Sequence, residues 1–162
     1  MGGEKNHIIT ANKKASFSYI LSDFFTCGIK LEGSEIKSIR HKQVNIVDAY
    51  CTIHNNEIWV KNMDIARYSF SNKEDYNPKK ERKLLLKKTE IKKIKKSLNE
   101  KGMSLIPTKL LINEKGLAKL EIAIGKGKKT YDKRESLKEK DSKLEIERKK
   151  ERSKFSLFSK IN

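Results

Sequence analysis

The chain is poor in the residues that mark several common protein classes. It has only two cysteines, Cys27 and Cys51, and both stand in apolar stretches without the spacing of a metal site or a disulfide framework. No apolar run approaches the ~18 residues that a membrane-spanning helix requires, and no signal peptide is visible. We therefore expect buried free thiols, no metal, no cofactor, no membrane partner and a cytoplasmic location.

Acidic residues are also scarce relative to basic ones. The 162 residues include 38 Lys and Arg but 21 Asp and Glu, which gives a formal net charge of +17. This excess predicts a strongly acidic partner, and nucleic acid is the leading candidate. The histidines His7, His41 and His54 stand far apart, without paired carboxylates or a nucleophile motif. Catalysis has no visible basis, and we expect a protein that is not an enzyme.

Alternating apolar residues predict a strand early in the chain. The alternation is strict over 25–31, and an earlier one over 17–21 leads into it. Residues 33–35 then end the strand, and the pattern beyond them predicts a short helix with Ser34 as its N-cap. Glu35, in the first turn, is expected to bond the free amides of that helix.

Two hairpins are predicted further along. Residues 44–53 are rich in β-branched and aromatic side chains, and Asn55-Asn56 separates them from a second strand over 57–60. Because asparagine tolerates positive φ, this pair predicts a tight turn. A second hairpin joins 104–112 to 117–124, where apolar and charged residues alternate.

Residues 77–102, between the hairpins, are predicted to form a helix. Its apolar stripe contains Leu84, Ile91, Ile94 and Leu98. The run of three leucines that begins at Leu84 is interpreted as a buried entry to the helix, Thr89 as the cap of the regular part and Gly102 as the stop. The segment 79–96 holds ten basic and two acidic side chains, so the face opposite the stripe is predicted to be a cationic ridge.

The C-terminal part has charge without a core. Residues 126–154 carry thirteen basic and seven acidic side chains, and their few large apolar residues form no continuous stripe. Pairs such as Glu139 with Lys143 add a helical bias of only ~0.2 to 0.5 kcal/mol each. We predict a domain over 1–125 and a basic tail over 126–162 that is disordered or helical, and that becomes helical on a partner.

Short strands, tight hairpins and a helix between strand pairs indicate a fold class. The chain is predicted to be mainly β with short helices, in the form of a small antiparallel β-barrel of the oligonucleotide-binding (OB) type with a basic C-terminal tail. Closure into a barrel would remove the exposed sheet edges that a protein of this size otherwise leaves open.

The sequence resembles the SsrA-binding protein family, also called small protein B, whose members are the protein partners of transfer-messenger RNA (tmRNA) in bacterial trans-translation. The resemblance runs in the family's order and near its spacing from about Ile8 to Asp141. The matching segments are 12–15, 28–40, 48–50, 57–59, 65–68, 82–86, 90–91 and 127–134.

The resemblance implies an RNA-binding protein with an OB-like barrel that holds the tRNA-like domain of tmRNA and delivers it to stalled ribosomes. It further implies that the tail enters the decoding centre and the empty mRNA channel of the small subunit and becomes helical there. The residues expected to bind RNA are Asn12, Lys14, Lys37, Arg40, Arg82, Lys83, Lys87, Lys126, Lys128 and Lys129. Those expected in the decoding centre are Tyr131, Asp132, Lys133 and Arg134.

Other interpretations stay open at this stage. The basic run after Gly125 could be a solubilising tail, and Lys37 and Arg40 could face solvent instead of RNA. Trp59, Tyr50 and Tyr68 could stack on bases, although core packing is the favoured interpretation for them. A ribosomal or ribosome-assembly protein with a basic extension is the alternative function, and an RNA nuclease is a remote third.

Overall fold

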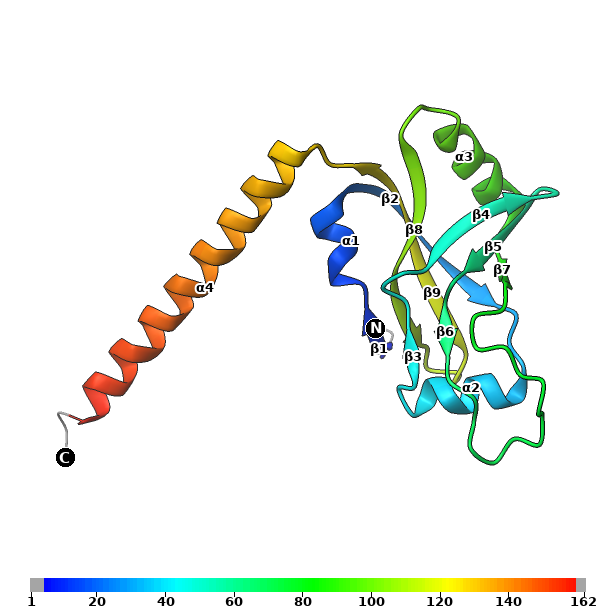
Figure 1. The fold of residues 1–162 in the computed structure, drawn as a ribbon, viewed down its shortest axis with the longest axis horizontal. Coiled ribbons are helices and arrows are strands. Elements are labelled where there is room, and N and C mark those ends of the chain that lie inside the picture. The colour runs from blue at the N-terminus through cyan, green and yellow to red at the C-terminus, as the bar shows by residue number, and fades with distance from the viewer. Residues whose placement is uncertain (1–4, 160–162) are drawn as a thin grey trace. The chain divides into compact units, whose positions relative to one another are not determined.

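The computed structural model describes residues 5–159, with side chains over 5–129 and 133–153 (Figure 1). The chain divides into two compact units, Met1–Gly127 and Lys128–Asn162. The part that the structure describes is mainly β, with the helices α1 (Lys13–Ser18), α2 (Gly33–Arg40), α3 (Lys88–Leu98) and α4 (Thr130–Ser159).

The first unit is built on an antiparallel sheet of seven strands over the described residues, in the order β1-β8-β4-β5-β7-β2-β9. β9 also pairs with β8, so the pairings from β8 through β4, β5, β7, β2 and β9 return to β8. The strands are β1 (His7–Ala11), β2 (Tyr19–Ile29), β4 (Tyr50–His54), β5 (Glu57–Lys61), β7 (Arg82–Leu85), β8 (Met103–Ile112) and β9 (Ala118–Gly127).

Both predicted hairpins are present. β4 and β5 pair through Asn55 and Asn56, whose φ angles of 50° and 58° are the left-handed values that this turn requires. β8 and β9 pair from Met103 with Lys126 to Ile112 with Ala118. The turn between them contains Gly116 at a φ of 78°, a conformation that suits glycine because it lacks a Cβ.

The strand predicted over 25–31 is part of β2, which ends at Ile29. The earlier prediction over 17–21 was wrong at its start, because Phe17 lies in α1 and β2 begins at Tyr19. Local hydrogen bonds favour the helix there. The Asn12 side chain accepts from the backbone N–H of Ala15 at 3.2 Å, which is the bond of a helix N-cap.

The core lies inside the sheet unit and under α2 and α3. Cys27 and Cys51 belong to it as buried free thiols, as predicted, and burial raises the pKa of the Cys27 thiol to about 12. The fully buried large apolar side chains are Ile39, Ile46, Ile58, Met63, Ile65, Ile94, Leu105, Leu110, Leu120, Ile122 and Ile124.

The segment 44–53 is not one strand. Val44–Asn45 forms β3, which pairs with β6 (Asp64–Ile65) in a separate small sheet, and the main sheet resumes only at Tyr50. Ile46 and Ala49 between them are buried in the core, so their apolar character reflects packing of a turn and not strand pairing. β-branched composition alone does not separate these two cases.

The helix prediction over 77–102 was wrong in its first half. β7 takes up the leucine run as a strand: Leu84 pairs with Ile29 of β2 and with Ile58 of β5. Hydrogen bonding to a neighbour on each side outweighs the local helical pattern. Only α3 is helical; its N-cap is Lys87, with Thr89 already inside the first turn, and it ends at Leu98, before Gly102.

Helix α3 has the two faces that the sequence predicted. Ile94 is fully buried, and Ile91 and Leu98 pack against the core.

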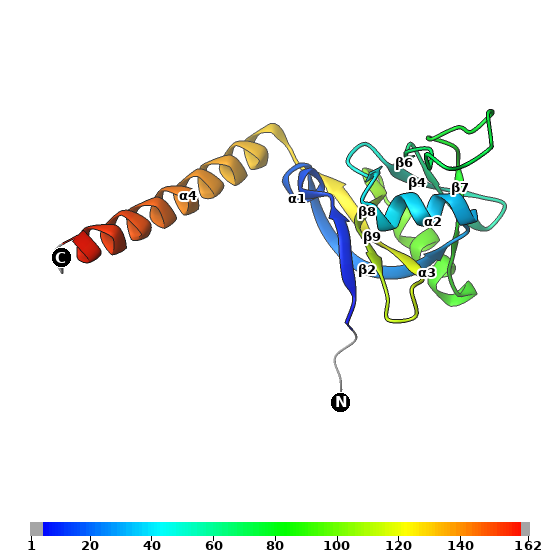
Figure 2. The same ribbon diagram turned by 90° about the horizontal axis from the view of Figure 1, so that it is seen from below.

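The N-cap predicted for α2 is wrong by two residues, since Ser34 lies inside the helix and the N-cap is Glu32. The Glu32 backbone N–H donates to Oε2 of Glu35 at 2.8 Å, so the carboxylate does bond a free amide. Figure 1 shows α2 and α3 at opposite ends of the first unit, and in Figure 2, which is seen from below, α2 lies in front of α3.

The second unit contains α4, which makes the tail a helix in this structure. Of its apolar side chains, the structure describes Leu137, Leu144 and Ile146, which are exposed at 48%, 42% and 54%. These three therefore have no core to pack against within the described part of the helix. None of the helices that the structure describes has the length and apolar character to cross a bilayer.

Candidate nucleic-acid interface

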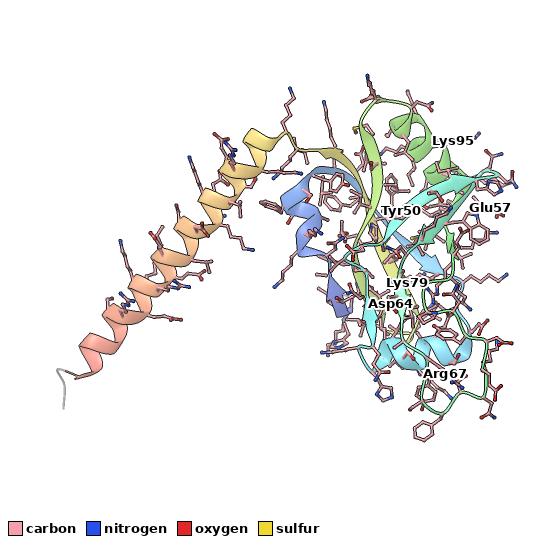
Figure 3. All side chains as sticks on the ribbon, in the orientation of Figure 1. Tyr50, Glu57, Asp64, Arg67, Lys79 and Lys95 are labelled. Carbon is pink, nitrogen blue, oxygen red and sulfur yellow. The ribbon has the colours of Figure 1, made fainter. Side chains whose placement is uncertain are left out.

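Helix α3 presents a row of lysines, which we call the α3 ridge: Lys88, Lys92, Lys93, Lys95 and Lys96, all exposed. Two of them are held in place by neighbours in the first unit. Lys93 Nζ lies 5.8 Å from the centre of the Phe25 ring. Lys95, which is labelled in Figure 3, donates from Nζ to Asn56 Oδ1 at 2.5 Å. A row of cations at this spacing can follow the phosphates of a nucleic-acid backbone.

The cations predicted at the end of α2 are both exposed. Lys37 Nζ lies 5.4 Å from the centre of the Tyr68 ring, a cation–π distance. Arg40 lines a groove of about 360 Å³ that also contains Leu85, Leu117 and Lys119. The groove thus combines exposed leucines with two cations and with one carboxylate, that of Glu32.

Arg82 was predicted to bind RNA, and the structure places its side chain in the interior of the first unit. The residue is 2% exposed, and its guanidinium is satisfied within the protein. Nε donates to Glu35 Oε1 at 2.8 Å, Nη1 to the carbonyl of Met63 at 2.7 Å and Nη2 to the carbonyl of Pro78 at 3.0 Å. With its donors bonded inside the protein, Arg82 holds the fold and leaves no donor fork for a phosphate.

Glu35 is the acidic partner of this buried cluster. It is 1% exposed, and besides Arg82 it lies 3.4 Å from Lys80 Nζ and 3.5 Å from the Tyr76 hydroxyl. Burial, followed by the nearby Glu35 charge, raises the pKa of Tyr76, so the phenol stays protonated and donates to the Ile65 carbonyl at 2.8 Å. Burying a carboxylate is costly unless hydrogen bonds and opposite charges such as these compensate for its lost hydration.

The segment 66–81, which we call the 66–81 loop, is tied to the start of α2. Glu32 accepts from Lys73 at 2.8 Å and from Lys80 at 3.0 Å. These bonds, with that of Lys73 first, lower the pKa of Glu32 to about 2. The loop is therefore fixed near α2 by two exposed pairs together with the buried Arg82 cluster.

Asn12 and Lys14 were both predicted to bind RNA, but the structure places them differently. Asn12 is 6% exposed, and it caps α1 and donates through Nδ2 to the Pro107 carbonyl at 3.1 Å, so its role is structural. Lys14 is exposed and lies 4.0 Å from Asp48, a distance at which the pair contributes little. Lys14 is thus available to a phosphate and Asn12 is not.

Lys83, Lys87 and Lys126 complete the predicted set in the first unit. Lys83 is half-buried and bonds Glu57 Oε1 at 2.7 Å, so RNA would have to compete with that pair. Lys87 is exposed where β7 leads into α3. Lys126 is exposed on β9, where it pairs with Ile20 and Met103. Pairing on both sides thus holds the backbone of Lys126 in the sheet, although this residue is close to the end of β9.

Within the second unit, Lys129 and Arg134 are exposed and Lys133 is half-buried. Lys128 Nζ lies 2.7 Å from the Ser136 hydroxyl, and the backbone N–H of Lys133 donates to the Lys129 carbonyl at 3.1 Å, the first turn of α4. Tyr131 and Asp132 lie in the helix, but their side chains fall outside those described.

The aromatic residues differ from the expectation of core packing. Tyr50 is 49% exposed, Trp59 is half-buried and Tyr68 is partly exposed over α2. The most exposed large apolar side chain of the described residues is one that sequence reasoning missed, Phe70 at 82%. An available signal was its setting, since Phe70 follows Tyr68 closely and stands among Ser69, Ser71 and Asn72 in a turn-forming segment.

Over the described residues, no group of three or more His, Cys, Asp or Glu side chains could hold a metal ion. The acidic side chains described above serve ion pairs and caps. What the surface offers instead is exposed cations with nearby aromatic rings, which is the chemistry of RNA binding.

Comparisons with known proteins place the chain in one family. The family model described as "SmpB protein" matches residues 9–152. The SsrA-binding protein of Parabacteroides distasonis is 48% identical over 143 residues, 88% of this chain and 94% of that protein. That of Phocaeicola vulgatus is 51% identical over 137 residues, 85% of this chain and 91% of its own length.

A solved structure adds a likeness in three dimensions. It is described as "tmRNA-SmpB: a journey to the center of the bacterial ribosome", and the matching chain superposes with a TM-score of 0.65 at 31% identity. The match covers 79% of this chain and 93% of that one.

Proposed function

Because the chain belongs to the SmpB protein family, we propose that it binds the tRNA-like domain of tmRNA and delivers this RNA to stalled ribosomes. The observation that carries the proposal is that the family match, over residues 9–152, extends through both compact units. The sheet unit and the tail helix therefore belong together in the function.

The sheet unit is proposed to be an OB-like barrel. Support comes from the closed circuit of pairings, in which β9 bonds both β2 and β8. In a small barrel the interior is filled by side chains and the outer face and loops bind the oligonucleotide. Ile122 and Ile124, fully buried on β9, fit that arrangement.

The proposed tmRNA surface consists of the exposed cations of the first unit: Lys14, Lys37, Arg40, Lys87, Lys126 and the α3 ridge, with Lys83 if its pair with Glu57 opens. Binding through Z phosphates should make log affinity fall with log salt at a slope of ~0.7Z to 0.9Z. Arg82 and Asn12 contribute by holding strands and helices in place.

The tail is proposed to enter the decoding centre and the empty mRNA channel. Lys128 and Lys129 would meet RNA phosphates, and Tyr131, Asp132, Lys133 and Arg134 would act in the decoding centre. Support comes from α4 itself, since its described apolar side chains Leu137, Leu144 and Ile146 are exposed and most of its described charged side chains are exposed as well. A helix of this kind gains its packing from a partner, and RNA supplies the opposite charge.

The proposal describes a binding protein that is not an enzyme and works without a cofactor, in the cytoplasm where stalled ribosomes are found. Its domains are proposed as the RNA-binding unit 1–125 and the tail 126–162. The pairing of Lys126 and Gly127 within β9 makes Gly127 the better point at which to separate the two experimentally.

The test is a truncation after Gly127, which keeps every residue of β9. We expect the truncated protein to keep much of its binding to tmRNA and to support no peptide tagging on stalled ribosomes. Binding is measured by titration of labelled tmRNA, and tagging by the tag added to a reporter without a stop codon. If the truncation abolishes both activities while the sheet unit remains folded, the division between barrel and tail is wrong.

The alternative function, a ribosomal or assembly protein with a basic extension, predicts a different result. Such a protein would co-sediment with vacant subunits without any tmRNA and would bind tmRNA no more tightly than another RNA of equal length. Both measurements use the full chain. The exposed cations alone would fit this alternative, whereas the family match favours tmRNA.

A further inference from the structure

Phe70 occupies an unusual position for a large apolar side chain. It is 82% exposed, more than any other large apolar residue that the structure describes. Its sequence neighbours are polar, from Ser69 on one side to Ser71, Asn72 and Lys73 on the other. The ring therefore stands in a polar stretch of the sequence and does not belong to an apolar run such as a buried segment would have.

The backbone beneath this ring is organised. The Ser71 N–H donates to the Tyr68 carbonyl at 2.9 Å, which closes a turn over 68–71. Arg67 Nη2 donates to the Ser71 carbonyl at 2.9 Å and bonds across the same turn. Since the turn is formed before any ligand arrives, less conformational entropy is lost when the ring makes a contact.

The ring also has aromatic and cationic neighbours, which we call the α2 aromatic cluster: His41, Tyr68 and Phe70, with Lys37. The centres of the Tyr68 and Phe70 rings are 5.5 Å apart at an angle of 59°. Tyr68 stacks on His41 at 6.2 Å and lies below Lys37 Nζ at 5.4 Å. Figure 3 shows Arg67 on the 66–81 loop next to α2.

We propose that Phe70 is a stacking platform for an unpaired RNA base, a contact separate from the phosphate-binding cations assigned above. The exposed ring supplies the flat apolar surface that a base requires, and Lys37 and Arg67 supply positive charge for the adjoining phosphates. Tyr68 and His41 set the position of the ring. The assignment to RNA rests on the proposed function, whereas the choice of this ring rests on its exposure and support.

An unpaired base could belong to tmRNA or to the RNA of the small ribosomal subunit, and the chemistry of the contact is the same. The test therefore has two binding arms, one with tmRNA and one with purified small subunits. Three variants are compared with the unmodified full chain: Phe70→Ala removes the ring, Phe70→Leu keeps an apolar side chain without a ring, and Phe70→Trp keeps a ring.

We expect Phe70→Ala and Phe70→Leu to weaken binding in at least one arm by about 5- to 150-fold, the range that stacking on one aromatic ring spans. Phe70→Trp should retain the affinity. Its new indole fluorescence should also be quenched by the RNA of that arm, above the background of Trp59, the single tryptophan of the natural chain. The arm that responds identifies which RNA supplies the base.

Two controls distinguish stacking from damage to the fold. Because Phe70 is exposed, none of its variants should move the denaturant midpoint of unfolding. Ile8→Ala truncates another exposed apolar residue, 51% exposed on β1, and should leave both affinities unchanged.

The inference is overturned if Phe70→Ala binds both RNAs as the unmodified chain does. It is also overturned if Phe70→Leu binds as well as Phe70→Trp, since that result would indicate an apolar contact without stacking. Failure of the unmodified chain to bind tmRNA would instead contradict the proposed function, and the small-subunit arm would still decide the role of Phe70.

Discussion

Arg82 Nη2 lies 2.8 Å from Glu35 Oε1, and both side chains are 1% exposed. The two residues are 47 positions apart in sequence, so this buried ion pair fixes α2 against β7 and the 66–81 loop. Removing one partner of a buried pair leaves a charge without compensation and costs about 3 to 5 kcal/mol. We expect Glu35→Ala to lower the free energy of unfolding by that amount in urea titrations.

The partly exposed pair of Glu57 with Lys83, at 2.7 Å, provides the matched control. Glu57→Ala removes a carboxylate of the same kind but should change the unfolding free energy by less than about 1 kcal/mol, because solvent screens the pair. Equal effects of the two substitutions would show that burial of the Arg82 cluster adds no stability.

Glu32 should make the free energy of unfolding depend on pH in acidic solution. Hydrogen bonds from Lys73 and Lys80 lower its pKa from 4.5 to about 2 in the folded protein. The ionised carboxylate therefore favours the folded state above pH 4.5, and this contribution is lost as the pH falls towards 2. Glu32→Gln removes it, so the difference in urea midpoint between the two proteins should shrink over that range. A difference that stays constant from pH 7 to pH 2.5 would contradict the assignment.

Gly125 has no room for a side chain. A Cβ there would lie 3.0 Å from Ile106 Cδ1, 3.1 Å from Tyr19 Cβ and 3.3 Å from Leu21 Cδ2. We expect Gly125→Ala to destabilise the first unit by about 1 to 3 kcal/mol, the usual cost of overpacking. Gly127→Ala is the control on the same strand, since its Cβ would meet nothing within 4 Å. Thermal unfolding of the two variants should separate them clearly.

The decoding-centre residues should affect tagging and not tmRNA affinity. We expect the combined change of Asp132, Lys133 and Arg134 to Ala to abolish peptide tagging on stalled ribosomes. Each phosphate contact contributes ~0.7 to 0.9 to the salt slope, so an unchanged slope for tmRNA would indicate that these residues make no phosphate contact with it. Normal tagging by the triple variant would rule out the proposed role.

Patterns that depend on neighbours in sequence were predicted well. The turn at Asn55 and Asn56, the hairpin ending at Ile124 and the apolar face of α3 at Ile94 all follow from local backbone preference or from periodicity. Each agrees with the structure because its tertiary partners are close in sequence or lie on one face of one element.

Features that depend on distant partners were not predicted. The leucines beginning at Leu84 are a strand because Ile29 and Ile58 are paired with Leu84, and neither partner is visible from the local pattern. Arg82 stands in a basic run, yet its buried partner Glu35 withdraws it from the surface. Phe70 is the reverse case of Arg82. A large apolar side chain is expected in the core, and only the structure shows that this one is exposed.

The double pairing of β9 also determines when this protein can fold during its own synthesis. Ser22 and Ile124 are register partners 102 positions apart, so β2 waits with an open edge until nearly the whole sheet unit has been translated. Among the described strands, β9 is the last to be translated, and its pairing with both β2 and β8 closes the sheet. A nascent chain cut short before Ala118 has no alternative strand to fill that place, and it exposes the hydrogen-bonding edges of β2 and β8 to aggregation.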